Sequence, residues 1–218
     1  MTNQNFWGSK NTVAWFRDEP APQYWVDFFK GLDRKQFSKV LDLGCGAGRN
    51  SEMLVDLGYD LYSCDLEPSM VKETLRRLRN KFPIEKWEAR IIVASMLALP
   101  YPQNNFDAII SNGAYHNTSS VEDMNQAIFE SSRVLHHDGF ICFNLFSSKY
   151  IATELKLIPE KPYVYLTAEG LDMTLVTPEK FLALAIDNGL ELIGQLAEYE
   201  REVSTGKRAV MRGVLRKI

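Results

Sequence analysis

With 218 residues, 45% of them hydrophobic and 24% charged, the chain has the composition of an ordinary globular protein with a sizeable core. Its formal charge of −3 lacks the basic character expected of a nucleic-acid partner. The chain shows no leader-like start, no apolar run of membrane-spanning length and no CxxC pair, so we expect a cytoplasmic protein with no membrane partner, no disulfide framework and no metal.

The N-terminal segment, residues 1–37, is rich in aromatic side chains. Four residues recur there at helical spacing, which predicts a helix packed on a sheet: Trp25, Phe28, Phe29 and Leu32. Trp7, Trp15 and Phe16 follow no such stripe. We interpret residues 1–20 as a lid that folds over the open end of the sheet and orders when a ligand binds. The alternative is that these residues pack permanently on the flank of the sheet as part of the core.

Strand-like and helix-like patterns then alternate over residues 38–146, which is typical of a parallel α/β sheet. The five predicted strands are Lys39–Leu43, Asp60–Asp65, Arg90–Ala94, Phe106–Ser111 and Phe140–Phe146. Predicted helices begin near Asn50 and at Pro68, where the missing N–H of proline does no harm. A third helix has four residues facing inward, Val121, Met124, Ile128 and Leu135, and ends in a turn over residues 136–139.

Residues 147–218 have a weaker pattern. Tyr163–Thr167 is a candidate short strand, and Thr177-Pro178 predicts the start of a helix that Gly189 ends. Leu190–Tyr199 and Ala209–Leu215 predict a final antiparallel pair joined by residues 204–206. We therefore expect one α/β domain over residues 1–218, with a doubly wound, mostly parallel seven-stranded sheet. Residues 1–37 would cover it, 38–146 would bind a cofactor, and 147–218 would supply a substrate-side insertion and the terminal strands.

A glycine-rich turn follows the first predicted strand, in the segment Val40-Leu41-Asp42-Leu43-Gly44-Cys45-Gly46-Ala47-Gly48-Arg49-Asn50. Glycine lets the backbone turn tightly and approach a ligand closely. A dinucleotide fingerprint, G-x-G-x-x-G, would need glycine where Arg49 stands. The spacing therefore indicates a nucleotide-like cofactor that is not a nicotinamide dinucleotide.

Asp65 ends the second predicted strand, 21 residues after Gly44. A carboxylate at that point can accept hydrogen bonds from both hydroxyls of a ribose. The plainer alternative is an acidic residue ahead of the helix that begins at Pro68. Strand position and spacing together favour ribose binding.

These markers resemble those of the class I S-adenosylmethionine-dependent methyltransferases. Ala94-Ser95-Met96-Leu97-Ala98-Leu99-Pro100 followed by Asn105-Phe106-Asp107 resembles the family stretch that ends in Leu-Pro-Phe and Phe-Asp. In the family an acid hydrogen-bonds the adenine amino group, and Ser95 stands in its place here. Ser132-Arg133-Val134-Leu135-His136-His137-Asp138-Gly139 resembles the turn into the fifth strand, and its paired histidines are interpreted as a solvated turn rather than a metal site.

The segment Ser111-Asn112-Gly113-Ala114-Tyr115-His116-Asn117 follows the fourth strand, at the edge where open sheets bind ligands. It lacks the Asn-Pro-Pro-aromatic motif of family members that methylate nucleic-acid bases, and it resembles small-molecule members instead. The predicted catalytic residues are His116, as a proton acceptor, and Tyr115. A histidine that only lines the pocket or caps the loop is the alternative.

The resemblance implies S-adenosylmethionine as cofactor and a small molecule as methyl acceptor, with an oligomeric state that the sequence does not indicate. The residues expected at the cofactor are Asp42, Gly44, Cys45, Gly46, Gly48, Asn50, Asp65, Leu66, Ser95, Met96, Asn112 and Gly113. Two other functions stay open, methylation of a protein or an RNA and binding of the cofactor without catalysis.

Overall fold

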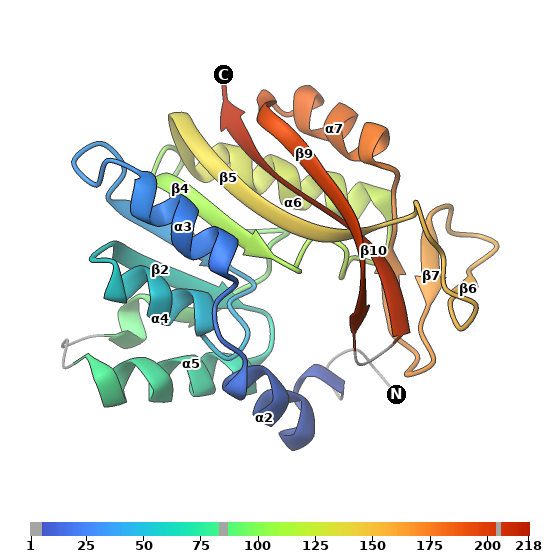
Figure 1. The fold of residues 1–218 in the computed structure, drawn as a ribbon, viewed down its shortest axis with the longest axis horizontal. Coiled ribbons are helices and arrows are strands. Elements are labelled where there is room, and N and C mark those ends of the chain that lie inside the picture. The colour runs from blue at the N-terminus through green and yellow to red at the C-terminus, as the bar shows by residue number, and fades with distance from the viewer. Residues whose placement is uncertain (1–5, 83–86, 204–205) are drawn as a thin grey trace.

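The computed structural model describes residues 6–82, 87–203 and 206–218. Seven strands form one sheet in the order β3-β2-β1-β4-β5-β10-β9 (Figure 1). The bounds of these strands are β1 Lys39–Leu43, β2 Asp60–Asp65, β3 Ile91–Val93, β4 Phe106–Asn112, β5 Leu135–Ser147, β9 Leu190–Val203 and β10 Gly206–Lys217. The first five are parallel, whereas β10 pairs antiparallel with both β5 and β9. This confirms the predicted fold class.

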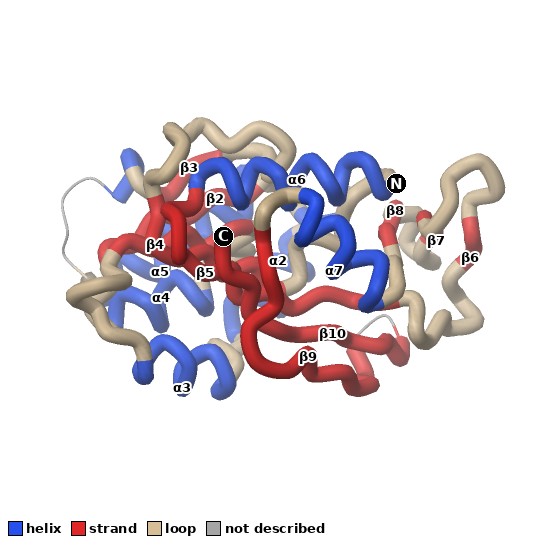
Figure 2. Tube along the Cα trace, turned by 90° about the horizontal axis from the view of Figure 1, so that it is seen from above, coloured by secondary structure: helices blue, strands red, loops and turns tan. Residues whose placement is uncertain are grey.

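Helices cover both faces of the sheet, as the view along it in Figure 2 shows. The helices are α2 Lys10–Asp18, α3 Gln23–Gly31, α4 Arg49–Asp56, α5 Pro68–Lys81, α6 Val121–Val134 and α7 Pro178–Asp187, with a short 3₁₀ turn η1 at Trp87–Ala89. Each strand sends alternate side chains to opposite faces. On β1, Leu41 and Leu43 join the cluster under α6 and α7, whereas Val40 joins the one under α3, α4 and α5. Both clusters are buried, which explains why the central strands read as continuous apolar runs.

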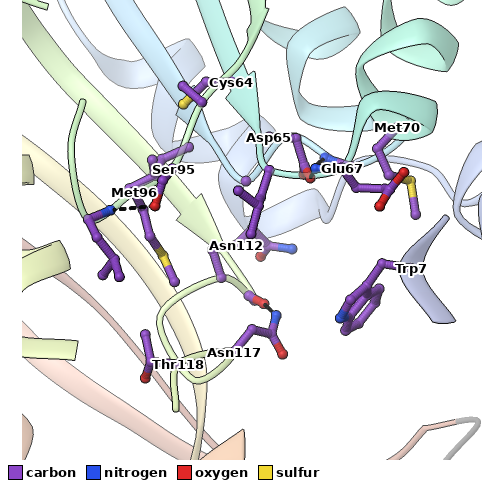
Figure 3. A pocket seen from close by; sticks show the side chains of 18 of the residues that line it. Trp7, Cys64, Asp65, Glu67, Met70, Ser95, Met96, Asn112, Asn117 and Thr118 are labelled. Atoms are coloured by element: carbon purple, nitrogen blue, oxygen red, sulfur yellow. Dashed lines mark hydrogen bonds between the residues drawn. The ribbon is translucent and has the colours of Figure 1, made fainter. Parts of the chain in front are cut away.

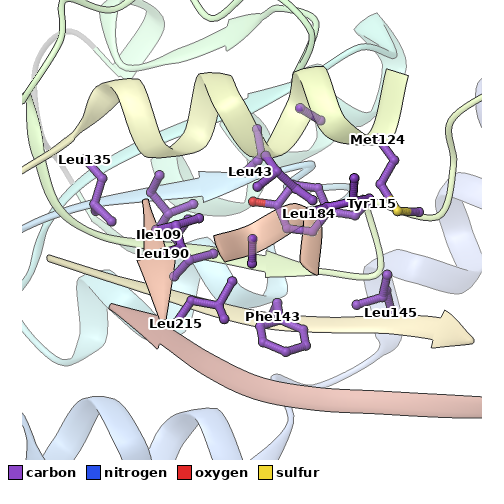
Figure 4. Packing of buried hydrophobic residues seen from close by; sticks show 14 of the residues in the cluster. Leu43, Ile109, Tyr115, Met124, Leu135, Phe143, Leu145, Leu184, Leu190 and Leu215 are labelled. Atoms are coloured by element: carbon purple, nitrogen blue, oxygen red, sulfur yellow. The ribbon is translucent and has the colours of Figure 1, made fainter. Parts of the chain in front are cut away.

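The core on the α6 and α7 face brings residues of β4 and β5 against both helices (Figure 4). Ile109 of β4 and Phe143 of β5 are fully buried there beside Met124 of α6 and Phe181 of α7. The predicted inward positions Met124 and Ile128 are confirmed. The three cysteines are free thiols, all buried, as expected of small apolar side chains.

Two predicted boundaries are wrong. Leu135 does not belong to the helix: α6 ends at Val134, and Leu135 is the first residue of β5. The predicted turn at 136–139 lies within β5, where Asp138 adopts a left-handed φ of 63° and the register with β4 shifts. Because α6 leads directly into β5, the chain reverses its direction within the irregular first residues of β5.

A second, three-stranded antiparallel sheet was only partly predicted. It consists of β6 Lys156–Leu157, β7 Val164–Leu166 and β8 Asp172–Thr174, of which β7 falls within the expected Tyr163–Thr167. The terminal pair β9 and β10 is antiparallel as predicted and longer than expected. Of the three residues predicted to join them, 204 and 205 lie outside the described residues, and Gly206 begins β10. None of the described helices has the length and apolar character required to cross a membrane.

Candidate functional site

A cavity of about 300 Å³ lies at the carboxyl edge of the sheet, where β1, β2 and β4 end side by side (Figure 3). Parallel strands present their carboxyl ends at one edge, and the order reverses at β1, since the chain turns from β2 and β3 on one side to β4 on the other. Eight predicted cofactor residues line this cavity: Gly44, Gly46, Asp65, Leu66, Ser95, Met96, Asn112 and Gly113. The topology thus gathers residues that are up to 69 positions apart in sequence, from Gly44 to Gly113.

The glycine turn after β1 is packed too closely for side chains at Gly44 and Gly48. Gly44, Gly46 and Gly48 all have positive φ, of 68°, 53° and 85°. A Cβ placed on Gly44 would lie only 2.7 Å from the Cβ of Ala114, beside the cavity. The turn is therefore a cradle that a larger residue would fill, and it leaves the backbone open to a ligand.

Asp65 stands at the edge of the cavity and connects it to the glycine turn. Its Oδ2 accepts a hydrogen bond from the Gly46 N–H and its Oδ1 one from the Glu67 N–H, both at 2.9 Å. Burial raises the pKa of this carboxyl, and the two backbone donors oppose that shift. Each oxygen keeps lone pairs beyond those used by the backbone. The side chain can therefore hold the turn and accept ribose hydroxyls together.

Asn112 forms part of the floor of the cavity, and the N-terminal helix α3 orients it. Its Oδ1 accepts hydrogen bonds from Trp25 Nε1 at 3.0 Å and from the Tyr24 hydroxyl at 3.2 Å. The Tyr24 oxygen in turn accepts one from Asn144 Nδ2 at 2.8 Å, and the Arg212 guanidinium lies 3.8 Å from the centre of its ring. The helical spacing of Trp25 predicts a packing role only. Its indole N–H was the available signal of this second role, because a buried tryptophan usually finds an acceptor.

Four predicted cofactor residues do not line the cavity, namely Asp42, Cys45, Gly48 and Asn50. The side chain of Asp42 is buried on the opposite face of β1 from Leu41 and Leu43, and its Oδ2 accepts a hydrogen bond from the Ser51 hydroxyl at 2.6 Å. Gly48 caps α4, and Asn50 is buried in that helix. Their nearness in sequence to the glycines does not bring them to the cavity, because strand alternation and the start of the helix turn them away from it.

The two predicted catalytic residues are also buried away from the cavity. Tyr115 packs in the core and donates a hydrogen bond to Ser131 at 2.8 Å, and burial raises the pKa of its hydroxyl. His116 stacks on Phe146 with ring centres 4.3 Å apart, and its Nδ1 accepts the Phe146 N–H at 3.2 Å. Burial, with the charge of Arg208, lowers the pKa of His116 to about 3. The neutral ring that this low pKa favours uses its Nδ1 lone pair for the Phe146 N–H. Neither residue lines the cavity, and the catalytic role of Tyr115 and His116 stays a prediction.

Residues outside the predicted cofactor set also form walls of the cavity. The N-terminal segment contributes Trp7 and Phe16, and the segment after β4 contributes Asn117, Thr118 and Ser119. Figure 3 shows Trp7 on one side of the cavity and Met96 on the other. Among the described residues that line it, the charged side chains are Asp65, Glu67 and Asp123, with no lysine, arginine or histidine. The lining is thus suited to a ligand that carries positive charge.

Comparison with known proteins decides the family. Residues 41–143 match the model of a family described as methyltransferase domain, and the matched segment runs from the glycine turn into β5. This segment is a methyltransferase domain of the class I S-adenosylmethionine-dependent kind. Membership makes S-adenosylmethionine the cofactor expected at this edge of the sheet. The residues present fit it: a glycine cradle, a carboxylate for the ribose and Leu66, 60% exposed at the cavity, as an apolar surface for the base.

Named relatives differ in what they act on. The methyltransferase chain is 29% identical over 150 residues to malonyl-[acyl-carrier protein] O-methyltransferase of Enterobacter lignolyticus, covering 66% of this chain and 55% of that protein. It is 31% identical over 131 residues to the probable tRNA methyltransferase 9B of mouse, covering 60% of this chain and 26% of that protein. The chain thus spans about half of the first relative's length and about a quarter of the second's.

A solved structure extends the likeness to nearly the whole fold. The S-adenosylmethionine-dependent methyltransferase of Methanosarcina mazei matches with a TM-score of 0.74, and the match covers 92% of this chain and 99% of that one. At 19% identity this similarity shows the shared fold. It extends beyond the matched family segment, which ends at residue 143.

Proposed function

We propose that the chain transfers the methyl group of S-adenosylmethionine to a small uncharged or cationic molecule. The observation that carries this proposal is the lining of the cavity, which among the described residues contains three carboxylates and no basic side chain. Such a lining favours the positively charged cofactor, and it disfavours an acceptor with phosphate or carboxylate groups. The absence of a base-methylation motif after β4 also supports a small acceptor over RNA.

The chain's own residues would act by holding and enclosing the reactants. When bound, the cofactor supplies a methyl group on a sulfonium that is already a good leaving group. Gly44 and Gly46 would let the backbone approach its amino-acid end, and Asp65 would hold its ribose. Asn112, fixed by Tyr24 and Trp25, would form the floor near the methyl group. Alignment of the acceptor with the methyl carbon and exclusion of water would then provide much of the acceleration.

Transfer of labelled methyl groups tests the substrate class. The chain is incubated with radiolabelled S-adenosylmethionine and, separately, with the low-molecular-mass, RNA and protein fractions of a cell extract. We expect the label to enter the low-molecular-mass fraction, and an Asp65→Ala variant to abolish that transfer. Label found only in RNA or in protein would contradict the proposed acceptor class. Cofactor binding without transfer to any fraction would favour a binding module instead.

The N-terminal segment is proposed to be a lid over this site. Phe16 lies 4.0 Å from a Cβ built on Gly46, and its ring centre is 5.8 Å from that of Trp7. Helix α2 has no buried residue of its own, and Trp15 is 43% exposed. Because so little of this segment is buried, an apolar ligand surface beneath it would add much of the contact that stabilises its ordered position.

Limited proteolysis tests the lid. We expect cleavage within residues 1–20 to slow when S-adenosylhomocysteine is bound, because the ligand would complete the surface on which Trp7 and Phe16 pack. Cleavage within residues 156–163, which are mostly exposed and do not line the cavity, provides the internal control. Equal cleavage rates of the N-terminal segment with and without ligand would contradict a lid that orders on binding.

A further inference from the structure

At the end of the cavity where the adenine is expected, the segment that follows β3 supplies no acidic side chain. With the ribose at Asp65 and the amino-acid end over the glycine turn, the base would lie against Leu66, Met96 and Leu97. Ser95 is the polar residue there, and its Oγ already accepts the Leu97 N–H at 3.2 Å, a bond drawn in Figure 3. Its hydroxyl keeps a single lone pair for a ligand.

Helix α6 runs beside residues 95–99 with a regular spacing of contacts. Glu130 Oε2 accepts the Leu99 N–H at 2.7 Å, and Gln126 Nε2 donates to the Leu97 carbonyl at 3.1 Å. Residues three, four or seven positions apart share one face of a helix, so Asp123 lies on the same face of α6 as Gln126 and Glu130. One turn back from Gln126, the helix carries Glu122 and Asp123.

Of these two positions, the cavity selects Asp123. Its side chain lines the cavity, whereas Glu122 is exposed and does not. The Asp123 backbone N–H is bonded to the Ser120 hydroxyl at 3.0 Å, which fixes the residue in the first turn of α6.

The carboxylate of Asp123 also differs from the other two that line the cavity. Asp65 accepts two backbone N–H groups, and Glu67 Oε1 accepts the N–H and the hydroxyl of Ser69. No hydrogen bond to the Asp123 carboxylate comes from the residues that the structure describes. This part of the cavity lining thus presents a partly buried carboxylate that accepts no hydrogen bond from the described residues.

We propose that Asp123 accepts a hydrogen bond from the 6-amino group of the adenine ring of S-adenosylmethionine. From helix α6, Asp123 would supply the charged acceptor that the neutral hydroxyl of Ser95 does not provide. The inference rests on S-adenosylmethionine as cofactor and is independent of the methyl acceptor. A carboxylate here favours a 6-amino base and disfavours a 6-oxo base, which would present a lone pair to it. Asp123 is therefore the residue that distinguishes adenine from hypoxanthine.

Calorimetric titration with S-adenosylhomocysteine and with S-inosylhomocysteine, its 6-oxo analogue, tests this. In the unmodified chain we expect the inosyl ligand to bind about ten- to a hundredfold more weakly, the range for a charged hydrogen bond. Asp123→Asn should reduce that ratio about tenfold or more, because an amide can turn either its oxygen or its NH₂ to the ring. Glu122→Gln, on the same turn of α6, is the matched control and should leave the ratio unchanged.

Three outcomes would overturn the proposal. The first is an unchanged ratio in a folded Asp123→Asn variant, with folding checked by circular dichroism. The second is a ratio that falls in Ser95→Ala and not in Asp123→Asn, which would assign the adenine edge to Ser95. The third is failure of the unmodified chain to bind either ligand, which would remove the cofactor assignment as well. If S-adenosylhomocysteine binds tightly and Asp123→Asn leaves the ratio of the two affinities unchanged, only the role of Asp123 is removed and the cofactor assignment stands.

Discussion

Replacing Asp65 with alanine is expected to weaken binding of S-adenosylhomocysteine roughly a hundred- to ten-thousandfold. Two charge-assisted hydrogen bonds to the ribose hydroxyls would be lost, each worth about 1.5–3 kcal/mol, and about 1.4 kcal/mol corresponds to a factor of ten. The variant also leaves the Gly46 N–H without the acceptor that it has at 2.9 Å, so the cradle itself loosens. Calorimetric titration measures the loss.

A control on the same strand separates binding from folding. Asp60 begins β2, at the end opposite Asp65, and pairs with Arg90 on the surface. Asp60→Ala should leave the affinity for S-adenosylhomocysteine unchanged. Asp65→Asn keeps the shape of the side chain and one acceptor oxygen, so its affinity should lie between those of the two alanine variants. An Asp65→Ala protein that folds normally and binds as tightly as the unmodified chain would show that Asp65 does not hold the ribose.

The second large effect concerns pH and the buried carboxyl of Asp42. Its side chain has no exposure, and none of the described donors reaches its Oδ1. Burial, reinforced by the charge of Asp65 and opposed by the Ser51 hydroxyl and Arg49, raises the pKa of Asp42 from 3.8 to about 7. Between these two values the folded state holds a proton that the unfolded state has released. The free energy of unfolding therefore falls as pH rises through this window, by up to about 4 kcal/mol in all.

Asp42→Asn is expected to remove this contribution. The amide oxygen can still accept the Ser51 hydroxyl, and no charge has to be buried at high pH. Between pH 5 and pH 8 the variant should gain about 2–3 kcal/mol of unfolding free energy relative to the unmodified chain, as measured by denaturant titration. The lowered pKa of His116 makes the free energy of unfolding rise with pH between about pH 3 and pH 6.5, which is the opposite trend. The quantity to follow is therefore the difference in unfolding free energy between the variant and the unmodified chain. Parallel pH curves for the two would contradict a raised pKa at Asp42, and Asp60→Asn is the matched control.

Much of the cofactor end of the site could be predicted, because it depends on elements that local patterns define. Gly44 follows one short strand and Asp65 ends the next, and parallel pairing alone brings the ends of β1, β2 and β4 to one edge. The same logic misplaces Asp42, since a residue two positions before the turn points to the opposite face from the residues on either side of it. Sequence proximity to a motif is a poor guide wherever strand alternation intervenes.

The rest of the site depends on contacts between distant segments. The loop after β4 is held by β8, where the Thr174 N–H donates to the His116 carbonyl, and this contact accompanies the burial of His116. The second sheet that supplies β8 has strands of two or three residues, which are too short for a periodic signal. Asp123 reads in sequence as an ordinary acid in the first turn of a helix, and only the alignment of α6 with residues 95–99 brings it to the cavity.

A crystal structure of the chain with S-adenosylhomocysteine bound tests most directly the claim that this cavity is the cofactor site. We expect the homocysteine end over Gly44 and Gly46, the ribose hydroxyls within hydrogen-bond distance of Asp65, and the adenine against Leu66 with its amino group facing Asp123. A ligand bound elsewhere, or one in this cavity with its ribose turned away from Asp65, would contradict it.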